Sequence, residues 1–140
     1  MPLGAISEHA ARFPKMGILH IDAHADLRVA YQGFEQSHAS IMHNVLHRVP
    51  NLSRLVQVGI RGTGYASEDL DWPRSQGFRV IQAEECWWKS LTPLMQEVRA
   101  QMGDGPVYLS FDIDSLDLVQ LHCPPTDVYY RQEIDRKSVV

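Results

Sequence analysis

Five side chains that suit metal ions occur at alternating positions in two short motifs. Asp22, His24 and Asp26 form the first motif, and Asp112 and Asp114 form the second. Successive side chains of an extended chain point to opposite faces, so residues two or four positions apart share a face. Each motif can therefore direct its side chains toward one point. Four carboxylates and one imidazole, brought together, would suit two adjacent divalent cations.

Each motif follows a short apolar run that is typical of a buried strand. The two runs are residues 17–21, Gly-Ile-Leu-His-Ile, and residues 107–111, Val-Tyr-Leu-Ser-Phe. Mostly apolar runs of this length, bounded by Gly and Pro, indicate strands that are covered on both faces. Open α/β sheets bind their ligands at the carboxyl ends of the parallel strands. The acidic motifs are therefore expected at the ligand-binding edge of such a sheet.

Four carboxylates in one place need a compensating charge. Their mutual repulsion and desolvation would cost several kcal/mol and would force some of them to bind protons. Two divalent cations would cancel the four negative charges. Hard oxygen ligands with one histidine favour manganese, while magnesium, iron(II) and zinc stay open. Two solvated acidic turns are the alternative, but that interpretation leaves the apolar runs before the motifs unexplained.

The two motifs resemble the signatures of the manganese-dependent ureohydrolases, the family that includes arginase, agmatinase and the guanidino acid hydrolases. Residues 22–26 match the family pattern DAHxD, and residues 110–117 match SFDxDxxDP up to its last position. The resemblance runs from about Gly4 to Asp117 and is greatest to agmatinase-like and guanidino acid hydrolase members. It implies a three-layer arginase-like α/β fold with a parallel sheet, of which this chain holds only the central part.

The resemblance also assigns roles to the residues of both motifs. Asp22 and Asp112 would bridge two manganese ions in each subunit. Asp26 would bind one ion, and His24 and Asp114 would bind the other. The implied reaction is hydrolysis of a guanidino compound, either agmatine or a guanidino acid, to urea and an amine. A hydroxide shared by the two metals would be the nucleophile.

A histidine twelve positions after the first motif is the candidate proton shuttle. The leaving amine needs a proton, which an imidazole can supply near neutral pH. His38 stands where the family has a mobile-loop histidine. A loop or helix-start histidine without a catalytic role is the alternative. His20, which shares the parity of Asp22, is interpreted as a buried, hydrogen-bonded core histidine.

Two other functions compete with a working ureohydrolase subunit. Zinc deacetylases also place an Asp-x-His motif and a second Asp around a metal, but a single-metal site has no use for Asp26 and Asp114. The other alternative is a non-catalytic fragment that at most binds metal. It is supported by two departures from the family pattern, which has a further metal-binding histidine before the position of Met1 and a substrate-binding glutamate after the second motif.

Helical and strand patterns alternate along the chain, as expected for parallel α/β packing. Residues 1–117 are expected to form a partial ureohydrolase domain, in which Asp117 would support the metal ligands. Residues 118–140 depart from the family pattern and are expected to form an atypical tail. Two origins are open for this tail: a non-native segment contributed by a truncated transcript, or a short natural basic end. Besides the runs before the motifs, the patterns predict helices at 7–12, 39–49 and 92–102 and strands at 55–60 and 78–81.

The composition is that of an ordinary intracellular enzyme, with 44% hydrophobic and 21% charged residues and a net charge of -4. The sequence has no basic stripe for binding nucleic acid. No apolar stretch approaches the roughly 20 residues that span a bilayer. Two cysteines without a disulfide spacing fit a reducing compartment.

We expect a small guanidino compound as the substrate of the protein. The resemblance also implies a homo-oligomer. Cytoplasmic and mitochondrial locations both stay open.

Overall fold

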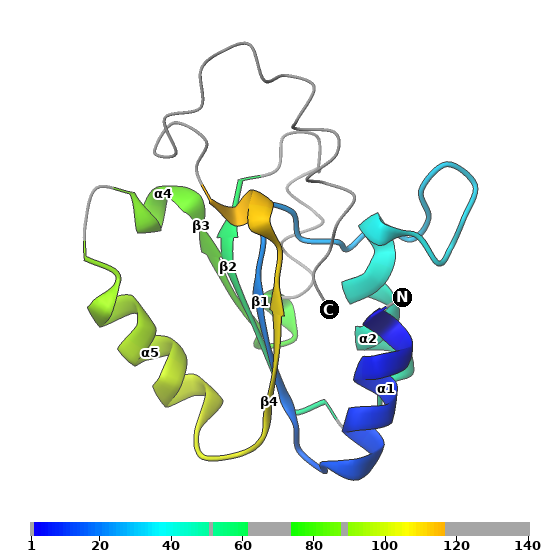
Figure 1. Cartoon of the computed structure of the whole chain (residues 1–140), viewed down its shortest axis with the longest axis horizontal. Coiled ribbons are helices and arrows are strands. Elements are labelled where there is room, and N and C mark those ends of the chain that lie inside the picture. The colour runs from blue at the N-terminus through cyan, green and yellow to red at the C-terminus, as the bar shows by residue number, and fades with distance from the viewer. Residues whose placement is uncertain (1, 51, 62–73, 88–89, 117–140) are drawn as a thin grey trace.

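The computed structural model describes residues 2–50, 52–61, 74–87 and 90–116, which surround a four-stranded parallel sheet (Figure 1). The strand order is β3-β2-β1-β4, and every neighbouring pair is parallel. The sequence prediction of an α/β fold with a parallel sheet is confirmed. The strands are β1 Gly17–Ile21, β2 Arg54–Ile60, β3 Arg79–Gln82 and β4 Val107–Phe111.

Helices lie on both faces of the sheet and make three layers (Figure 1). α1 and α2 cover one face, α5 covers the other, and the short α4 follows β3 directly. The described residues also form two 3-10 helices: η1 leads into α2, and η2, which contains Asp114, follows β4. The first helix begins earlier than the sequence pattern predicted. The bounds are α1 Pro2–Arg12, η1 His38–Ser40, α2 Ile41–Arg48, α4 Ala83–Cys86, α5 Thr92–Met102 and η2 Ile113–Ser115.

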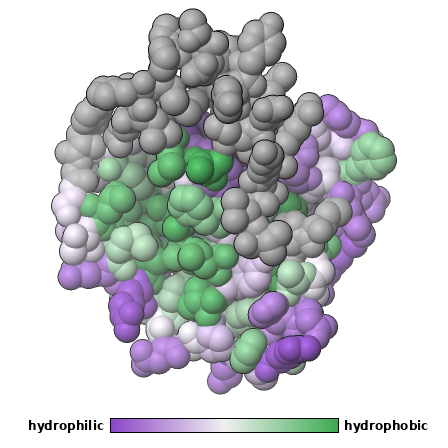
Figure 2. All heavy atoms as spheres, in the orientation of Figure 1, coloured by the Kyte–Doolittle hydropathy of each residue, from purple (hydrophilic) through white to green (hydrophobic). Residues whose placement is uncertain are grey.

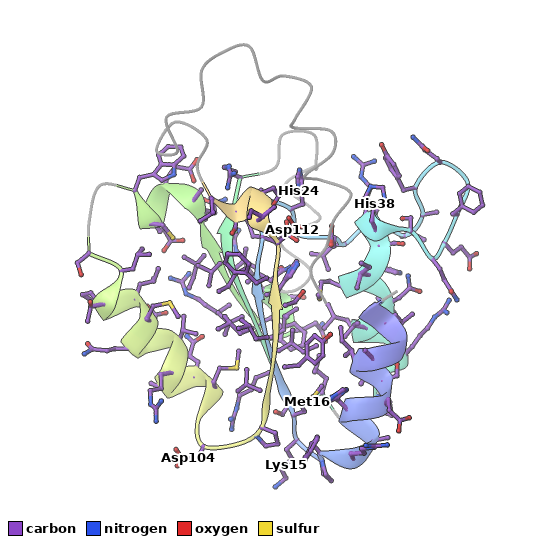
Figure 3. All side chains as sticks on the ribbon, in the orientation of Figure 1. Lys15, Met16, His24, His38, Asp104 and Asp112 are labelled. Carbon is purple, nitrogen blue, oxygen red and sulfur yellow. The ribbon has the colours of Figure 1, made fainter. Side chains whose placement is uncertain are left out.

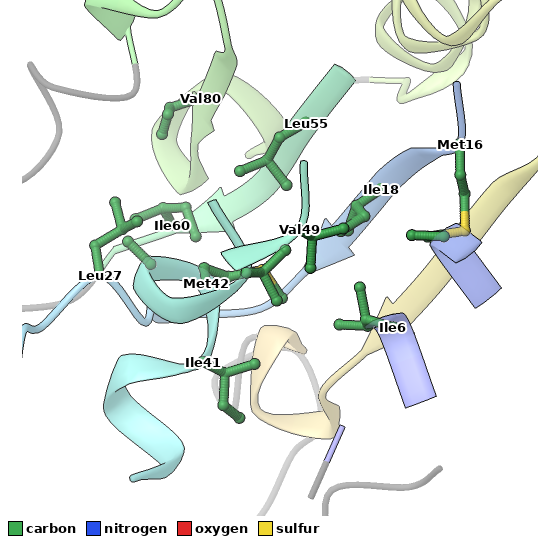
Figure 4. Close-up of a cluster of buried hydrophobic side chains, with 13 residues drawn as sticks. Ile6, Met16, Ile18, Leu27, Ile41, Met42, Val49, Leu55, Ile60 and Val80 are labelled. Carbon is green, nitrogen blue, oxygen red and sulfur yellow. The ribbon is translucent and has the colours of Figure 1, made fainter. Parts of the chain in front are cut away.

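The larger hydrophobic core lies between the sheet and the pair α1 and α2 (Figure 4). Ile18, in β1, is fully buried there, as are Ile6 of α1 and Val45 of α2. The apolar residues of α2 recur every three to four positions, so they form one face of the helix that packs on the sheet. This packing fixes the position of the chain that links the first motif to α2.

The opposite face of the sheet is covered less completely by α5. A Pro in the first turn favours the start of this helix, and Gly103 ends it with a φ of 64°, a conformation that glycine adopts without strain. Val98 and Met102 are buried, but Met95 is 38% exposed. The reason is that Met95 lines an open depression of about 410 Å³ between α5 and the start of β4. This depression lies at the amino end of β4, away from the acidic motifs.

β4 is the edge strand of the described sheet, and its exposure differs from the prediction. The apolar run predicted cover on both faces, yet Val107, Leu109 and Phe111 are 41%, 59% and 41% exposed. The strand has a single neighbour, β1, so one of its edges and part of its faces lack cover from the described residues. Figure 2 shows apolar side chains gathered over β4 and α5. Exposed apolar edges of this kind favour association between chains.

Several expectations fall on parts of the chain that the structure does not describe. The supporting role of Asp117 and the character of residues 118–140 both lie outside the described residues. Within the described residues, none of the helices is long and apolar enough to cross a membrane.

Candidate metal centre

The register between β1 and β4 brings the two acidic motifs side by side. Ile21 lies opposite Phe111 in this parallel pair. The ladder continues past both strands, since the N–H of Asp112 donates to the carbonyl oxygen of Ile21 at 2.8 Å. Asp22 and Asp112 therefore leave adjacent strands at the same carboxyl edge, where the sequence predicted them. Figure 3 shows His24 and Asp112 together at this edge.

Both carboxylate oxygens of Asp22 accept hydrogen bonds, and the residue is 5% exposed. Oδ1 accepts a hydrogen bond from the N–H of His24 at 2.7 Å, and Oδ2 lies 2.9 Å from Nε2 of His20. Burial by itself would raise the pKa of Asp22, but the hydrogen bonds from His20 and His24 outweigh it and hold the pKa below its usual range. Asp22 is therefore ionised throughout the neutral range of pH.

His24 joins the first motif to the second. Its Nδ1 lies 2.9 Å from Oδ2 of Asp114 and 3.6 Å from Oδ1 of Asp22. The hydrogen bond to Asp114, followed by that to Asp22, raises the pKa of His24 to about 10. Asp114 is fixed from the other side, because its Oδ1 accepts from the N–H of Ala23 at 3.1 Å. The carboxylates of this edge thus stabilise a cation placed between them.

Asp26 and Asp112 are the other two carboxylates of the motifs at this edge of the sheet. Burial, followed by the charge of Asp22, raises the pKa of Asp26 well above its usual value, and Asp114 and Asp112 add to the effect. Asp26 has a backbone φ of 55°, a conformation that Asp and Asn adopt more readily than most residues. Asp112 caps η2, since its Oδ1 accepts from the N–H of Asp114 at 3.0 Å. The second motif is therefore held by hydrogen bonds of its own.

Among the described residues, two groups of three side chains place their potential ligand atoms within 4.8 Å of one another. Asp112 lies outside both groups, although its charge acts on Asp26. Buried and partly buried carboxylates in such proximity repel one another, and divalent cations relieve that repulsion. Carboxylate oxygens with an imidazole are donors that manganese accepts. The donor set therefore fits a divalent metal. The first group is Asp22, His24 and Asp114, and the second is His20, Asp22 and Asp26.

His38 begins η1 and lies at the same end of the sheet as His24 (Figure 3). Its side chain is exposed, and its ring meets the ring of Tyr31 edge to face with centroids 5.2 Å apart. The segment is anchored by the fully buried Ser40, whose hydroxyl donates to the carbonyl oxygen of Glu35 at 2.7 Å. His38 belongs to neither of the two acidic groups. Its ring is open to solvent, as the exchange of protons with water requires.

Two residues that organise this edge were not singled out from the sequence. Arg61 follows β2, and its guanidinium donates to the carbonyl oxygens of residues 114–116. Gly59 has a φ of 93° at an irregularity in the pairing of β2 with β3, and a Cβ there would lie 3.3 Å from the carbonyl oxygen of Asp22. The glycine inside an apolar strand was the available signal for Gly59.

The raised pKa of His24 predicts a pH-dependent stability for the metal-free chain. The folded value of about 10 exceeds the unfolded value of 6.5, so protonated His24 stabilises the fold. That contribution is full below pH 6.5 and is lost as the pH rises through about 10. We expect the Tm of EDTA-treated protein to fall between pH 7 and pH 10, and to fall less in His24→Asn. Thermal denaturation followed by circular dichroism measures the Tm of both proteins. An equal decrease of Tm in the wild type and in His24→Asn would contradict the role of His24.

Comparison with known proteins identifies the family of this chain. Residues 1–122 match the family described as the arginase family. The chain belongs to the arginase family. This finding confirms the resemblance inferred from the two motifs, and it argues against a zinc deacetylase.

Two curated relatives and one solved structure show how much of an arginase-family protein this chain represents. Guanidinobutyrase of Pseudomonas aeruginosa is 51% identical over 104 residues, which are 74% of this chain and 33% of that protein. Mitochondrial agmatinase of Gallus gallus is 44% identical over 128 residues, covering 84% of this chain and 38% of that protein. The structure of proclavaminate amidino hydrolase from Streptomyces clavuligerus superimposes with a TM-score of 0.74 at 28% identity, over 84% of this chain and 39% of that one. The chain thus spans less than two fifths of the length of these relatives.

Proposed function

We propose that this chain supplies the metal-binding edge of a ureohydrolase, which hydrolyses a guanidino compound to urea and an amine. The convergence of Asp22, His24 and Asp114 at the carboxyl edge of the sheet carries this proposal. Relatives named guanidinobutyrase and agmatinase support a guanidino compound as the substrate class. Agmatine and guanidino acids are both candidates.

Manganese is the proposed metal, with two ions held by the two motifs. Following the family resemblance, Asp22 and Asp112 would be shared by both ions, Asp26 would hold one ion, and His24 and Asp114 would hold the other. Such a pair of ions supplies a strong oxygen nucleophile at neutral pH, which the resonance-stabilised guanidinium group requires. His24 has to release its proton before it can bind a metal, because only the neutral imidazole has a free lone pair.

His38 is proposed to give the leaving amine its proton. We expect His38→Asn to lower urea release by about 10²–10⁴-fold, the usual contribution of a general acid, and to leave manganese affinity unchanged. The exposed His47 of α2 provides the matched control His47→Asn, which should retain full turnover. Urea release and manganese titration on the same samples measure both quantities. Unchanged turnover in His38→Asn would rule out the shuttle role.

A second candidate is a metal-binding piece without turnover. It is favoured by the small share of the relatives that the chain covers, 33% and 38% of their lengths. Purified chain loaded with manganese should be offered agmatine, 4-guanidinobutyrate, 3-guanidinopropionate and arginine, with Asp114→Ala as the inactive control. Urea from any of these substrates would support hydrolysis and identify the substrate. Manganese binding without urea would support the second candidate, and failure to bind manganese would contradict both.

A further inference from the structure

A buried chain of hydrogen bonds lies behind Asp22. His20 of β1 is 1% exposed and Gln57 of β2 is 0% exposed, and the two lie opposite each other in the parallel pair. Nε2 of Gln57 lies 2.8 Å from the carbonyl oxygen of Ala25 and 3.0 Å from Nδ1 of His20. Nε2 of His20 lies 2.9 Å from Oδ2 of Asp22. A continuous path therefore leads from a backbone carbonyl to a carboxylate of the metal motif.

The carbonyl of Ala25 fixes the orientation of the Gln57 amide. A carbonyl oxygen can only accept, so the group 2.8 Å away must be the NH₂ of Gln57. The second hydrogen of that nitrogen is then donated to Nδ1 of His20. The cost is that Oε1 of Gln57 is buried with no hydrogen-bond partner among the described residues. The reverse orientation would set two oxygens against each other at 2.8 Å, which is repulsive.

This orientation fixes the position of the ring hydrogen of His20. Because Nδ1 accepts from Gln57, the hydrogen is on Nε2, where it is donated to Oδ2 of Asp22. Neither ring nitrogen of His20 then has a free lone pair for a metal. His20 lies close enough to Asp22 and Asp26 to be counted as a ligand by distance, yet its hydrogen bonds exclude that role.

We propose that Gln57 and His20 are positioning residues that orient the carboxylate of Asp22 for metal binding. Oδ2 of Asp22 accepts from His20 and Oδ1 accepts from the N–H of His24, so rotation of the carboxylate breaks both bonds. Each oxygen keeps a further lone pair for a cation. Groups that hold metal ligands in this way commonly contribute 10–100-fold, as an order of magnitude, to metal affinity. The inference rests on the proposed function, since it concerns the same metal site.

The ring hydrogen can be located without any metal. Two-bond ¹H–¹⁵N correlation NMR on EDTA-treated, ¹⁵N-histidine-labelled protein distinguishes the two nitrogens. We expect His20 to carry its hydrogen on Nε2, and in Gln57→Met, which lacks the amide donor, we expect the Nδ1 signal to move toward that of a nitrogen without a hydrogen bond. A hydrogen on Nδ1 of His20 in the wild type would overturn the proposal.

Manganese titration followed by the EPR signal of free Mn²⁺ tests the effect on the site. We expect Gln57→Met and His20→Leu to weaken binding by about 10–100-fold. His20→Gln should restore most of the affinity, because its amide N–H can reach Asp22. Val56→Ala is the control for general destabilisation, since Val56 is 2% exposed in the same strand as Gln57 and makes no part of the path. It should lower the Tm and leave manganese affinity unchanged.

The outcomes separate the two proposals. Unchanged affinity in a folded Gln57→Met, or equal losses in Val56→Ala and Gln57→Met, would overturn the positioning role. If His20→Leu does not fold, Gln57→Met and the rescue by His20→Gln decide the question. A wild-type chain that takes up no manganese would overturn the proposed function, while the ring-nitrogen signals would still decide the hydrogen-bond path.

Discussion

Replacing Asp26 with asparagine is expected to stabilise the metal-free chain at pH 7 and to weaken manganese binding at the same time. The pKa of Asp26 is raised well above 3.8 by burial and then by the charge of Asp22. Its protonated form therefore stabilises the fold below pH 3.8, and this contribution is lost as the pH rises. Asparagine is neutral at every pH, has nearly the same size, and tolerates the φ of 55° at this position.

The metal affinity of Asp26→Asn should move in the opposite direction, because a charged ligand is lost. We expect a loss at least as large as the roughly 10–100-fold that removal of an outer-shell partner causes. Thermal denaturation in EDTA at pH 4 and pH 7, with manganese titration at pH 7, measures both effects. Asp104→Asn is the control, since Asp104 is exposed at the opposite end of the molecule (Figure 3). An Asp26→Asn protein that binds manganese normally, or is less stable at pH 7, would contradict this account.

Ile18→Ala is expected to lower the free energy of unfolding by about 2–5 kcal/mol. Domains have a total stability of roughly 5–15 kcal/mol, so this loss would remove a large part of it. Ile18 is 0% exposed in β1, which pairs with both β2 and β4 and packs against the core under α1 and α2. The same strand leads into Asp22, so the loss of order would also reduce manganese binding.

Leu109→Ala is the matched control for Ile18→Ala. Leu109 pairs with Leu19 of β1 but is 59% exposed on the edge strand. Its truncation should change stability by no more than about 0.5 kcal/mol. Denaturant unfolding followed by circular dichroism measures both variants. Similar losses in the two would contradict the difference in burial between Ile18 and Leu109.

The first motif was the most predictable part of the site because its information is local. An apolar run followed by Asp22, His24 and Asp26 at alternating positions indicates a strand and its polar end without any knowledge of the neighbours. The placement of Asp22 and Asp112 at the same edge also followed from the pattern, since the carboxyl ends of parallel strands meet at one edge. That their two strands are neighbours is known only from the strand order. The ligand roles of these residues stay predictions.

The exposure of β4 could not be predicted because an apolar run does not say how many neighbours a strand has. The same residues would bury Leu109 if β4 were a central strand. In the edge strand that the structure shows, Leu109 is exposed. The local environment of His20 was predicted correctly as buried and hydrogen-bonded. Its partner Gln57 is 37 residues away on β2, so only the strand register reveals that the pair acts on Asp22.

Arg61 was hidden from sequence reasoning for the same reason. Its guanidinium donates to the carbonyl oxygens of residues 114–116, which are more than fifty positions away along the chain. Backbone acceptors carry no side-chain signature, so no pattern in the sequence marks them. Contacts of this kind emerge only when the order of the strands is known.

The number of manganese ions bound per chain tests the central claim most directly. Purified wild type and Asp112→Ala should be loaded with manganese and freed of excess metal by desalting. Their metal content is then measured by inductively coupled plasma mass spectrometry. The proposed binuclear site predicts two ions per wild-type chain and fewer in Asp112→Ala. A wild-type chain without bound manganese, or the same metal content in both proteins, would contradict it.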